Sequence, residues 1–268
     1  MNILFIGDLV GSSGRRILKA KLPALKERYQ IDLCIANAEN AAAGLGLTQD
    51  LAHEINDSGV DILTLGNHSW SKRDLLHTAD HIPFLIRPMN VPKAWPGLSY
   101  TVVHHKKGKV LVLNLLGRVF MDQADDPFAA VDKVMATVKK DQNISMMVVD
   151  FHAEATSEKN AMGHYLDGRA SLVAGTHTHV QTADERILEK GTAYITDVGM
   201  TGPLNSIIGM EVASSLRRFV ERLPSPYACA KGPAVLSAIA VSIHEASGKA
   251  EKIERILVHE HESATLPK

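Results

Sequence analysis

Short apolar runs alternate with helical patterns from the first residue onward. The apolar runs predict strands at residues 2–6, 31–38 and 60–65. The helices between and after them are expected at residues 14–28 and 48–57 and from residue 71 onward. Thr48 is the expected N-cap of the second helix, and Ser71 with Asp74 forms a capping box for the third. This repeated strand–helix order is typical of a parallel sheet with helices on its faces.

Two pairs of apolar runs later in the chain predict antiparallel hairpins. Residues 100–105 and 109–115 flank a turn-like His-Lys-Lys-Gly break, and residues 234–244 and 252–259 flank Ala-Ser-Gly-Lys. The other expected elements are strands at 146–151, 171–174 and 193–196, helices at 126–140 and 206–222, and a glycine-rich loop at 197–202. Because the pattern contains no repeat and no long linker, it predicts one α/β domain over residues 1–268, with two packed sheets and helices outside.

Composition excludes several classes of protein. The 29 basic and 30 acidic side chains give a formal charge of -1, which argues against binding nucleic acid by bulk electrostatics. No apolar run reaches the roughly 18–20 residues of a membrane helix, and the first residues lack the pattern of a signal peptide. Two cysteines are too few for a disulfide framework. We therefore expect a soluble cytoplasmic protein without a membrane partner. The unusual count is histidine, with 13.

Polar residues that directly follow the predicted strands point to a metal site. The carboxyl ends of parallel strands meet at one edge of a sheet, where open α/β proteins hold their working groups. Five strand ends are followed by carboxylate, carboxamide or imidazole side chains, namely Asp8, Glu39, Asn40, Asn67, His68, His152, His177 and His179. Taken singly, each residue is most simply a turn former, a cap or a solvated histidine. Their convergence on one edge favours a shared function.

The chemistry of this set suits transition metals. Oxygen and nitrogen ligands without cysteine are typical of iron, manganese or zinc sites. Seven of these eight side chains as ligands already exceed the needs of one tetrahedral ion, so we expect two ions that together clamp a phosphoryl group. His177 and His179 are two positions apart, and in a loop they could point to separate ions.

The same residues resemble a known family. Gly-Asp at 7–8, Gly-Asn-His at 66–68 and Gly-Thr-His-Thr-His at 175–179 resemble the calcineurin-like metallophosphoesterases. The longer segments resemble their YmdB-like branch of 2′,3′-cyclic-nucleotide phosphodiesterases: FIGDLVGSSGRR, NAENAAAG, LTLGNHSW, VDFHAEATSEK, YLDGRASLVAGTHTHVQTADERIL and AYITDVGMTGP. These segments lie within residues 5–203, and the resemblance implies the two-sheet αββα sandwich of the metallophosphoesterase type.

The resemblance also implies roles for the individual residues. The first metal ion would be held by Asp8, Glu39, Asn40 and His179. The second would be held by Glu39, which bridges, and by Asn67, His152 and His177. A hydroxide between the ions would attack the phosphorus of a 2′,3′-cyclic nucleotide or related phosphodiester, and His68 would protonate the leaving oxygen. The resemblance further suggests a homo-oligomer.

Two departures from the wider superfamily limit what can be transferred. Asp8 is followed by Leu9 and Val10 where the superfamily has Asp-x-His, and Glu39 stands where an aspartate usually bridges. Both are features of the YmdB-like branch, in which Asn40 supplies the missing ligand. These departures argue against assigning the activity of the protein phosphatases to this chain.

Other interpretations of the same sequence stay open. The centre could serve a phosphomonoesterase, or a regulator that binds a nucleotide or an RNA end with little turnover. The run Gly-Ser-Ser-Gly-Arg-Arg at 11–16 could hold a phosphate, although a turn with solvated arginines is the simpler interpretation. Asp150 could orient His152 or could only bond at the core edge. A nicotinamide-binding protein is disfavoured because the glycine fingerprint is missing.

Overall fold

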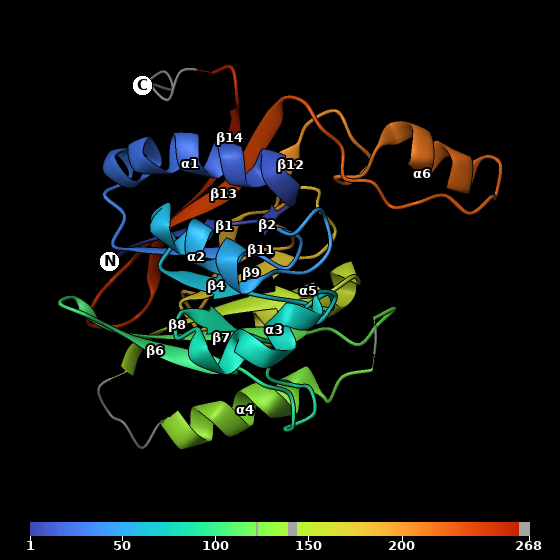
Figure 1. Ribbon diagram of the computed structural model, residues 1–268. Helices are drawn as coiled ribbons and strands as arrows, with labels where there is room; N and C mark the ends of the chain where they lie inside the picture. Colours follow the sequence, from blue (N-terminus) through green and yellow to red (C-terminus); the bar gives the residue numbers. More distant parts are fainter. Residues whose placement is uncertain (122, 139–143, 263–268) are drawn as a thin grey trace.

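Two mixed β-sheets face one another and carry helices on their outer faces (Figure 1). The computed structural model describes residues 1–121, 123–138 and 144–262. The strands of the first sheet are β1 (Asn2–Ile6), β2 (Asp8–Leu9), β3 (Leu33–Asn37), β4 (Ile62–Thr64), β5 (Leu85–Ile86), β12 (Met200–Pro203), β13 (Ala234–Ile243) and β14 (Ala250–His259). Their order is β2-β12-β13-β1-β3-β4-β5, with β14 beside β13.

The second sheet has six strands in the order β10-β11-β9-β8-β7-β6. Their bounds are β6 (Tyr100–His105), β7 (Gly108–Leu116), β8 (Ile144–His152), β9 (Leu172–Thr176), β10 (Arg186–Ile187) and β11 (Ala193–Ile195). The helices are α1 (Gly11–Arg28), α2 (Gln49–Asp57), α3 (Arg73–Thr78), α4 (Pro127–Val138), α5 (Thr156–Tyr165) and α6 (Val212–Phe219), with a short 3-10 turn at Ala79–His81. The expected αββα sandwich is confirmed.

Alternating side chains of one strand fill two different layers of the sandwich. In β1, Leu4 and Ile6 pack with the outer helix α1, whereas Ile3 and Phe5 lie in the core between the sheets. Strand β7 repeats this arrangement in the second sheet, whose outer face packs against α4 and α5. Because both faces of each sheet are covered, the central strands are continuous apolar runs.

Parallel pairing brings the carboxyl ends of the central strands to the same edge. In the first sheet, β1 pairs in parallel with β3, β3 with β4, and β4 with β5. In the second, β7, β8, β9 and β11 are likewise parallel. The two expected hairpins, β6–β7 and β13–β14, are antiparallel as predicted.

Several predicted helix boundaries are correct and others are wrong. Thr48 caps α2 by accepting a hydrogen bond from the Leu51 amide, and Asp126 caps α4 in the same way. Ser71 does not cap α3, which begins at Arg73, because the Asp74 carboxylate instead accepts the Gln49 amide. Residues 139–140 of the fourth predicted helix lie outside the described residues.

The largest error concerns the helix predicted at 206–222. Only α6 forms there, because residues 207–210 make a tight turn in which Ile207 and Met210 bond to each other. The predicted loop at 197–202 is also wrong in part, since its end is strand β12, which pairs with β2 and β13. Within the described ranges, no helix combines the length and apolar character needed to cross a bilayer.

Candidate metal centre

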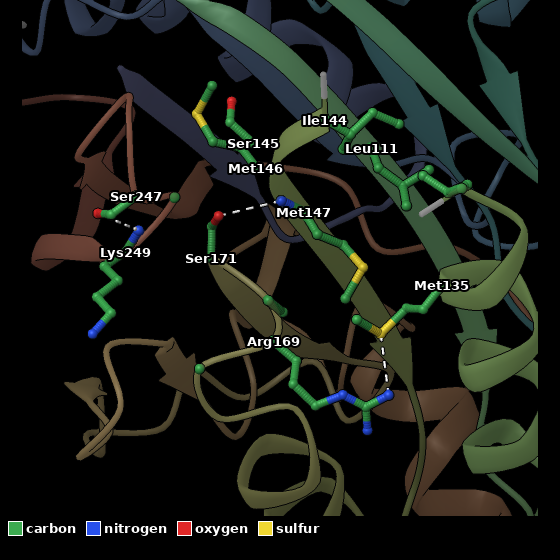
Figure 2. A pocket seen from close by; sticks show the side chains of 14 residues that line it. Leu111, Met135, Ile144, Ser145, Met146, Met147, Arg169, Ser171, Ser247 and Lys249 are labelled. Carbon is green, nitrogen blue, oxygen red and sulfur yellow. Dashed lines mark hydrogen bonds between the residues drawn. The ribbon is translucent and has the colours of Figure 1, made fainter. Parts of the chain in front are cut away.

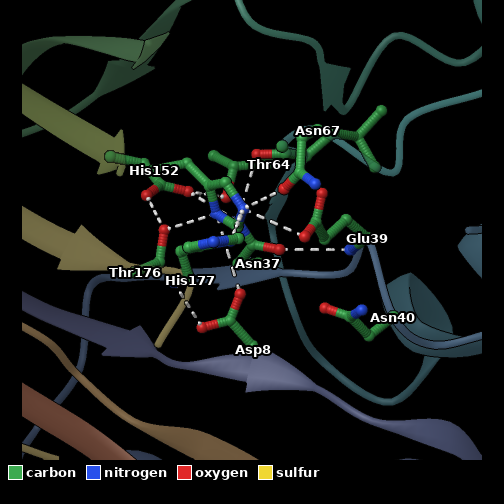
Figure 3. Close-up of polar contacts among 12 residues, drawn as sticks. Asp8, Asn37, Glu39, Asn40, Thr64, Asn67, His152, Thr176 and His177 are labelled. Atoms are coloured by element: carbon green, nitrogen blue, oxygen red, sulfur yellow. Dashed lines mark hydrogen bonds and ion pairs between the residues drawn. The ribbon is translucent and has the colours of Figure 1, made fainter. Parts of the chain in front are cut away.

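The polar residues that follow the strands gather at one edge of the sandwich (Figure 3). Asp8, Glu39 and Asn67 come from the first sheet, and His152 and His177 come from the second. Each lies at or just beyond the carboxyl end of a strand, so the site spans the boundary between the sheets. Asn40 lies beside Glu39 on the same loop.

Three side chains converge on the Nε2 atom of His152. The Glu39 Oε1, Asn67 Oδ1 and His177 Nδ1 atoms each lie 3.0 Å from it. Ligand atoms of Glu39, His152 and His177 all lie within 4.8 Å of one another, and His152 is fully buried. Electron-pair donors crowded in this way match the donor set of a transition-metal ion.

Two buried oxygen atoms at the centre accept no hydrogen bond from any described residue. They are Asp8 Oδ1 and Asn40 Oδ1. The other Asp8 oxygen accepts the His177 amide at 3.2 Å, and the Asn40 amide nitrogen donates to the Gly44 carbonyl at 2.9 Å. A buried acceptor without a donor costs free energy that a cation would recover. The donor set therefore fits a metal ion.

The electrostatics of the site favour added positive charge. Burial raises the pKa of Asp8, and the negative charges of Asp197 and Glu39 act in the same direction. Burial also acts to raise the pKa of Glu39, but the neighbouring His152 outweighs it and lowers that pKa to about 2. In turn, Glu39 and the other carboxylates overcome the burial of His152 and raise its pKa to about 9. A bound cation would supply the positive charge that the His152 proton otherwise supplies.

A hydrogen-bonded row of side chains beneath the site holds His152 in position. Its Nδ1 atom lies 2.9 Å from the Thr176 hydroxyl, which donates to Asp150 at 2.7 Å. Asp150 also accepts hydrogen bonds from Asn37 and Thr64, both at the ends of first-sheet strands. Asp150 therefore acts on His152 through Thr176, and these contacts tie the two sheets together under the site.

The loop that carries His177 and His179 has an uncommon backbone. The φ angles of these residues are 104° and 65°, in the left-handed region that costs energy for residues other than glycine. The Thr178 amide and hydroxyl both donate to Asp197, which forms a buried ion pair with Lys159 at 2.7 Å. These contacts hold the loop so that its two imidazoles diverge.

His179 lies at the rim, outside the cluster formed by Glu39, His152 and His177. Its Nδ1 atom is 2.9 Å from the Ile208 carbonyl oxygen, which can only accept a hydrogen bond. Nδ1 therefore carries the proton, and Nε2 keeps the lone pair that a metal ion would require.

A cavity of about 430 Å³ opens over the cluster. His68, His177 and His179 line it, and an apolar wall is supplied by Ile208, Met210 and Tyr227. The His68 amide donates to Glu39 at 2.8 Å, which fixes the backbone that carries its imidazole. Gly66 precedes Asn67 and His68. A side chain at position 66 would overlap Glu39 and His152, so only glycine lets the backbone approach these two residues so closely.

Glu154 is a residue of the site that the sequence did not indicate. Its Oε2 atom lies 3.1 Å from His177 Nε2 at the mouth of the same cavity. A carboxylate at this distance favours the His177 proton on Nε2, which would leave the Nδ1 lone pair facing His152. The contact therefore favours one tautomer of His177.

A second cavity, of about 420 Å³, lies at the amino end of β8 and has different chemistry (Figure 2). Apolar side chains such as Leu111, Met135 and Met147 form much of its lining, with Arg169 and Lys249 as the charged members. None of the described residues that line it is an aspartate, a glutamate or a histidine. It therefore cannot hold the metal chemistry expected at the other end of the strand.

Comparison with known proteins places the chain in a family. The sequence profile described as YmdB-like protein matches residues 4–256. The chain belongs to the YmdB-like family. A family relative from Bacillus subtilis (strain 168), named 2′,3′-cyclic-nucleotide 2′-phosphodiesterase, is 49% identical over 260 residues, which are 97% of this chain and 98% of that protein.

Two crystal structures resemble this YmdB-like chain over nearly its whole length. One, of a hypothetical protein from Thermus thermophilus, has a TM-score of 0.90 and 41% identity, and the match covers 97% of this chain and 100% of that one. The other, of a novel phosphatase from Mycoplasma pneumoniae, has a TM-score of 0.89 and 36% identity, covering 97% and 93%. Both the predicted family and the predicted fold class are thereby confirmed.

Proposed function

We propose that the protein is a metal-dependent phosphodiesterase that hydrolyses 2′,3′-cyclic nucleotides or related phosphodiesters. The observation that carries this proposal is the convergence of Glu39, Asn67 and His177 on His152, beside buried oxygens that lack donors. The name of the Bacillus subtilis relative supports the substrate class.

We further propose that the centre takes two ions, iron or manganese, with zinc as a third option. The first would bind Asp8, Glu39, Asn40 and His179, and the second would bind Glu39, Asn67, His152 and His177. The mixture of carboxylate, amide and imidazole donors without thiolate supports these metals. When bound, such a pair lowers the pKa of water to roughly 7 and offsets charge on the phosphoryl oxygens.

In this proposal His68 donates a proton to the leaving ribose oxygen. The hydrogen bond from its amide to Glu39 holds the residue next to the centre, and the residue lines the cavity. Imidazole is suited to proton transfer near neutral pH, and such transfer contributes roughly 100- to 10,000-fold to a rate. The neighbouring Asn67 faces His152 instead, so the two adjacent residues have separate roles.

The apolar wall of the cavity would contact the nucleoside. Tyr227 is 62% exposed at this wall, and the Arg218 guanidinium lies 3.7 Å from the centroid of its ring. An exposed aromatic ring offers a nucleobase a surface on which to stack. Ile208 and Met210 extend the same wall toward the imidazoles.

A substrate panel tests the proposal. Protein purified without oxygen would first be analysed for bound iron, manganese and zinc, and then assayed with that metal on cyclic nucleotides, bis-p-nitrophenyl phosphate and p-nitrophenyl phosphate. We expect faster turnover of the two diesters. Faster turnover of the monoester would favour a phosphomonoesterase. Tight, metal-dependent nucleotide binding with negligible hydrolysis would favour a regulator that binds a nucleotide or an RNA end.

Three broader predictions accompany this function. We propose a single domain over residues 1–268, which is supported by the core that strands of both sheets share. We also propose a homo-oligomer in the cytoplasm. Light scattering of the purified protein and fractionation of cells would test the assembly and the location.

A further inference from the structure

A cationic cavity lies beside the candidate metal centre. It has a volume of about 470 Å³, and Arg15, Lys72 and Lys231 contribute its charged side chains. The other lining residues are Ser12, Ala42, Ala43, Leu51, Cys229 and Ala230. The three cations come from α1, from the residue before α3, and from the segment that precedes β13. No acidic residue is among the described residues that line this cavity.

One loop separates this cationic cavity from the metal centre. Asn40 and Gly44 line the cavity over the metal centre, whereas Ala42 and Ala43 line the cationic cavity. The loop also packs against a lining residue of each cavity: a Cβ added to Gly44 would lie 2.6 Å from Met210, which lines the cavity over the metal centre, and 3.6 Å from Cys229, which lines the cationic cavity. The two cavities are therefore neighbours, and one substrate could reach both across this loop.

The positive charge of the cationic cavity is largely uncompensated. Neither Lys72 nor Lys231 forms an ion pair with a described residue. Arg15 does, since its Nε atom lies 3.1 Å from Glu54 and a second nitrogen donates to the Ala41 carbonyl. Counting Glu54, the group carries two net positive charges in a chain whose total is -1, and Glu211, whose charge acts on the lining residue Cys229, reduces this excess. Concentrated charge of this kind attracts an anionic group of a ligand.

We propose that the cationic cavity binds a second phosphate of the substrate, attached to the 5′ oxygen of the nucleoside whose cyclic phosphate is hydrolysed. The inference rests on the proposed function, and it makes the preferred substrate a nucleotide with phosphates on both sides of the ribose. Such a phosphate is either the terminal 5′-phosphate of a mononucleotide or the last internal diester of an RNA chain. Of the two arginines in the run at 11–16, only Arg15 contributes, because Arg16 does not line the cavity and pairs with Glu260.

Three substrates separate these possibilities in one kinetic experiment. They are a nucleoside 2′,3′-cyclic phosphate, the same compound with a 5′-phosphate, and a dinucleotide that ends in a 2′,3′-cyclic phosphate. For the wild-type protein we expect a lower KM for the second or third compound than for the first. A lower KM for the dinucleotide alone identifies an RNA end as the source of the second phosphate. A lower KM for the 5′-phosphorylated compound alone identifies a mononucleotide.

A charge-neutral variant supplies the decisive comparison. Lys72→Gln combined with Lys231→Gln should raise KM for the compounds with a second phosphate by about 3- to 10-fold. The double variant should also weaken the dependence of this KM on salt concentration. The KM for the simple cyclic nucleotide should not change. Lys93→Gln combined with Lys133→Gln removes the same charge from exposed positions elsewhere and should leave all three KM values unaltered.

The possible failures are distinguishable. Equal KM values for the three compounds in the wild type, or an equal change of all three in the variant, would overturn the second phosphate site but leave the proposed function intact. Hydrolysis of none of the three by metal-loaded protein would contradict the proposed function. In that event, calorimetric titration with the dinucleotide still decides the inference, because the double variant must bind it more weakly than the wild type does.

Discussion

Strand β8 connects two cavities of similar volume but different chemistry (Figures 2 and 3). At its amino end, residues 144–147 line a pocket of mainly apolar side chains, and one of the two charged lining residues, Arg169, is paired with Asp132. At its carboxyl end, His152 lies among buried carboxylates, and oxygens of Asp8 and Asn40 accept no hydrogen bond from a described residue.

The difference between the two ends separates stability from function. Paired charges and apolar packing lower the free energy of the folded chain by themselves, whereas buried oxygens without donors raise it. A fold keeps such oxygens only where another species satisfies them. We therefore expect substitutions at the carboxyl end to change metal content and turnover, and substitutions at the amino end to change the free energy of unfolding.

The largest effect is expected for Asp8→Ala. This change removes a buried carboxylate from the first proposed metal site, so the protein should lose at least one ion and fall to background activity. Elemental analysis and the phosphodiesterase assay measure both quantities on the same sample, after circular dichroism has verified the fold. Retention of two ions by the variant would remove Asp8 from the ligand set.

His68→Ala should have the next largest effect and a different signature. Removal of the proton donor should lower kcat by about 100- to 10,000-fold, while both ions stay bound because the imidazole is not a proposed ligand. The two variants are thus matched controls for each other. Loss of an ion from His68→Ala, with normal metal content in Asp8→Ala, would show that the roles are assigned the wrong way round.

Met147→Ala tests the amino end of the same strand. Met147 is buried between β8 and the outer layer of the second sheet, so its truncation should lower the free energy of unfolding by about 2–5 kcal/mol. Below the unfolding transition, kcat and metal content should equal those of the wild type. Urea denaturation measures the free energy of unfolding. A fall in metal content of the folded variant would mean that the two ends of β8 are coupled.

Glu154→Gln returns to the carboxyl end with a smaller effect. Glutamine keeps a hydrogen-bond acceptor for His177 but removes the negative charge that increases the basicity of this proposed ligand. Metal affinity should fall by about 10-fold, measured by competition with a chelator. Glu189→Gln, at an exposed position, serves as the control. Equal affinities of the two variants would show that Glu154 does not act through His177.

The sequence predicts the long elements and misses several of the short ones for a physical reason. Strands of five or more residues and capped helices repeat an apolar period often enough to be recognised. Strands β2, β5, β10 and β12 have two to four residues and were missed, whereas the three-residue strands β4 and β11 were predicted at 60–65 and 193–196. The helix expected at 206–222 fails because Ile208 and Gly209 have φ angles of 46° and 97°, which end the helical path before α6.

The site shows a similar division. Residues such as Glu39 and His152 could be predicted because parallel strands must end at a common edge. Asn37 and Thr176 were not identified, since each is the last residue of an apolar strand and continues the strand rather than following it. The left-handed backbone at His177 was also unpredictable, because histidine, unlike glycine, gives no sequence signal for a positive φ.

The smallest effect is expected for Asp32→Asn, which also belongs to the amino end. Asp32 accepts the Asn2 amide and the Lys107 ammonium, both at 2.8 Å, and so joins β1 to the β6–β7 hairpin of the other sheet. Burial acts to raise the pKa of Asp32, but these two partners outweigh it and hold the pKa below its ordinary value. A carboxylate with a lowered pKa stabilises the fold above about pH 4, and this stabilisation is lost as the pH falls through the folded value.

The Asp32→Asn variant should therefore be less stable than the wild type at pH 7, by less than Met147→Ala is, with unchanged turnover and metal content. The difference in free energy of unfolding between the two proteins should shrink below about pH 4, because the wild type then loses the stabilisation by the Asp32 carboxylate, which the variant already lacks. Urea midpoints at pH 7 and below pH 4 measure this difference. Asp57→Asn, at an exposed position, is the control and should unfold at the same midpoint as the wild type. A gap that widens on acidification would mean that Asp32 is protonated in the fold. The amino end would then contain an unpaired acid, like the carboxyl end, and the distinction between the two ends of β8 would fail.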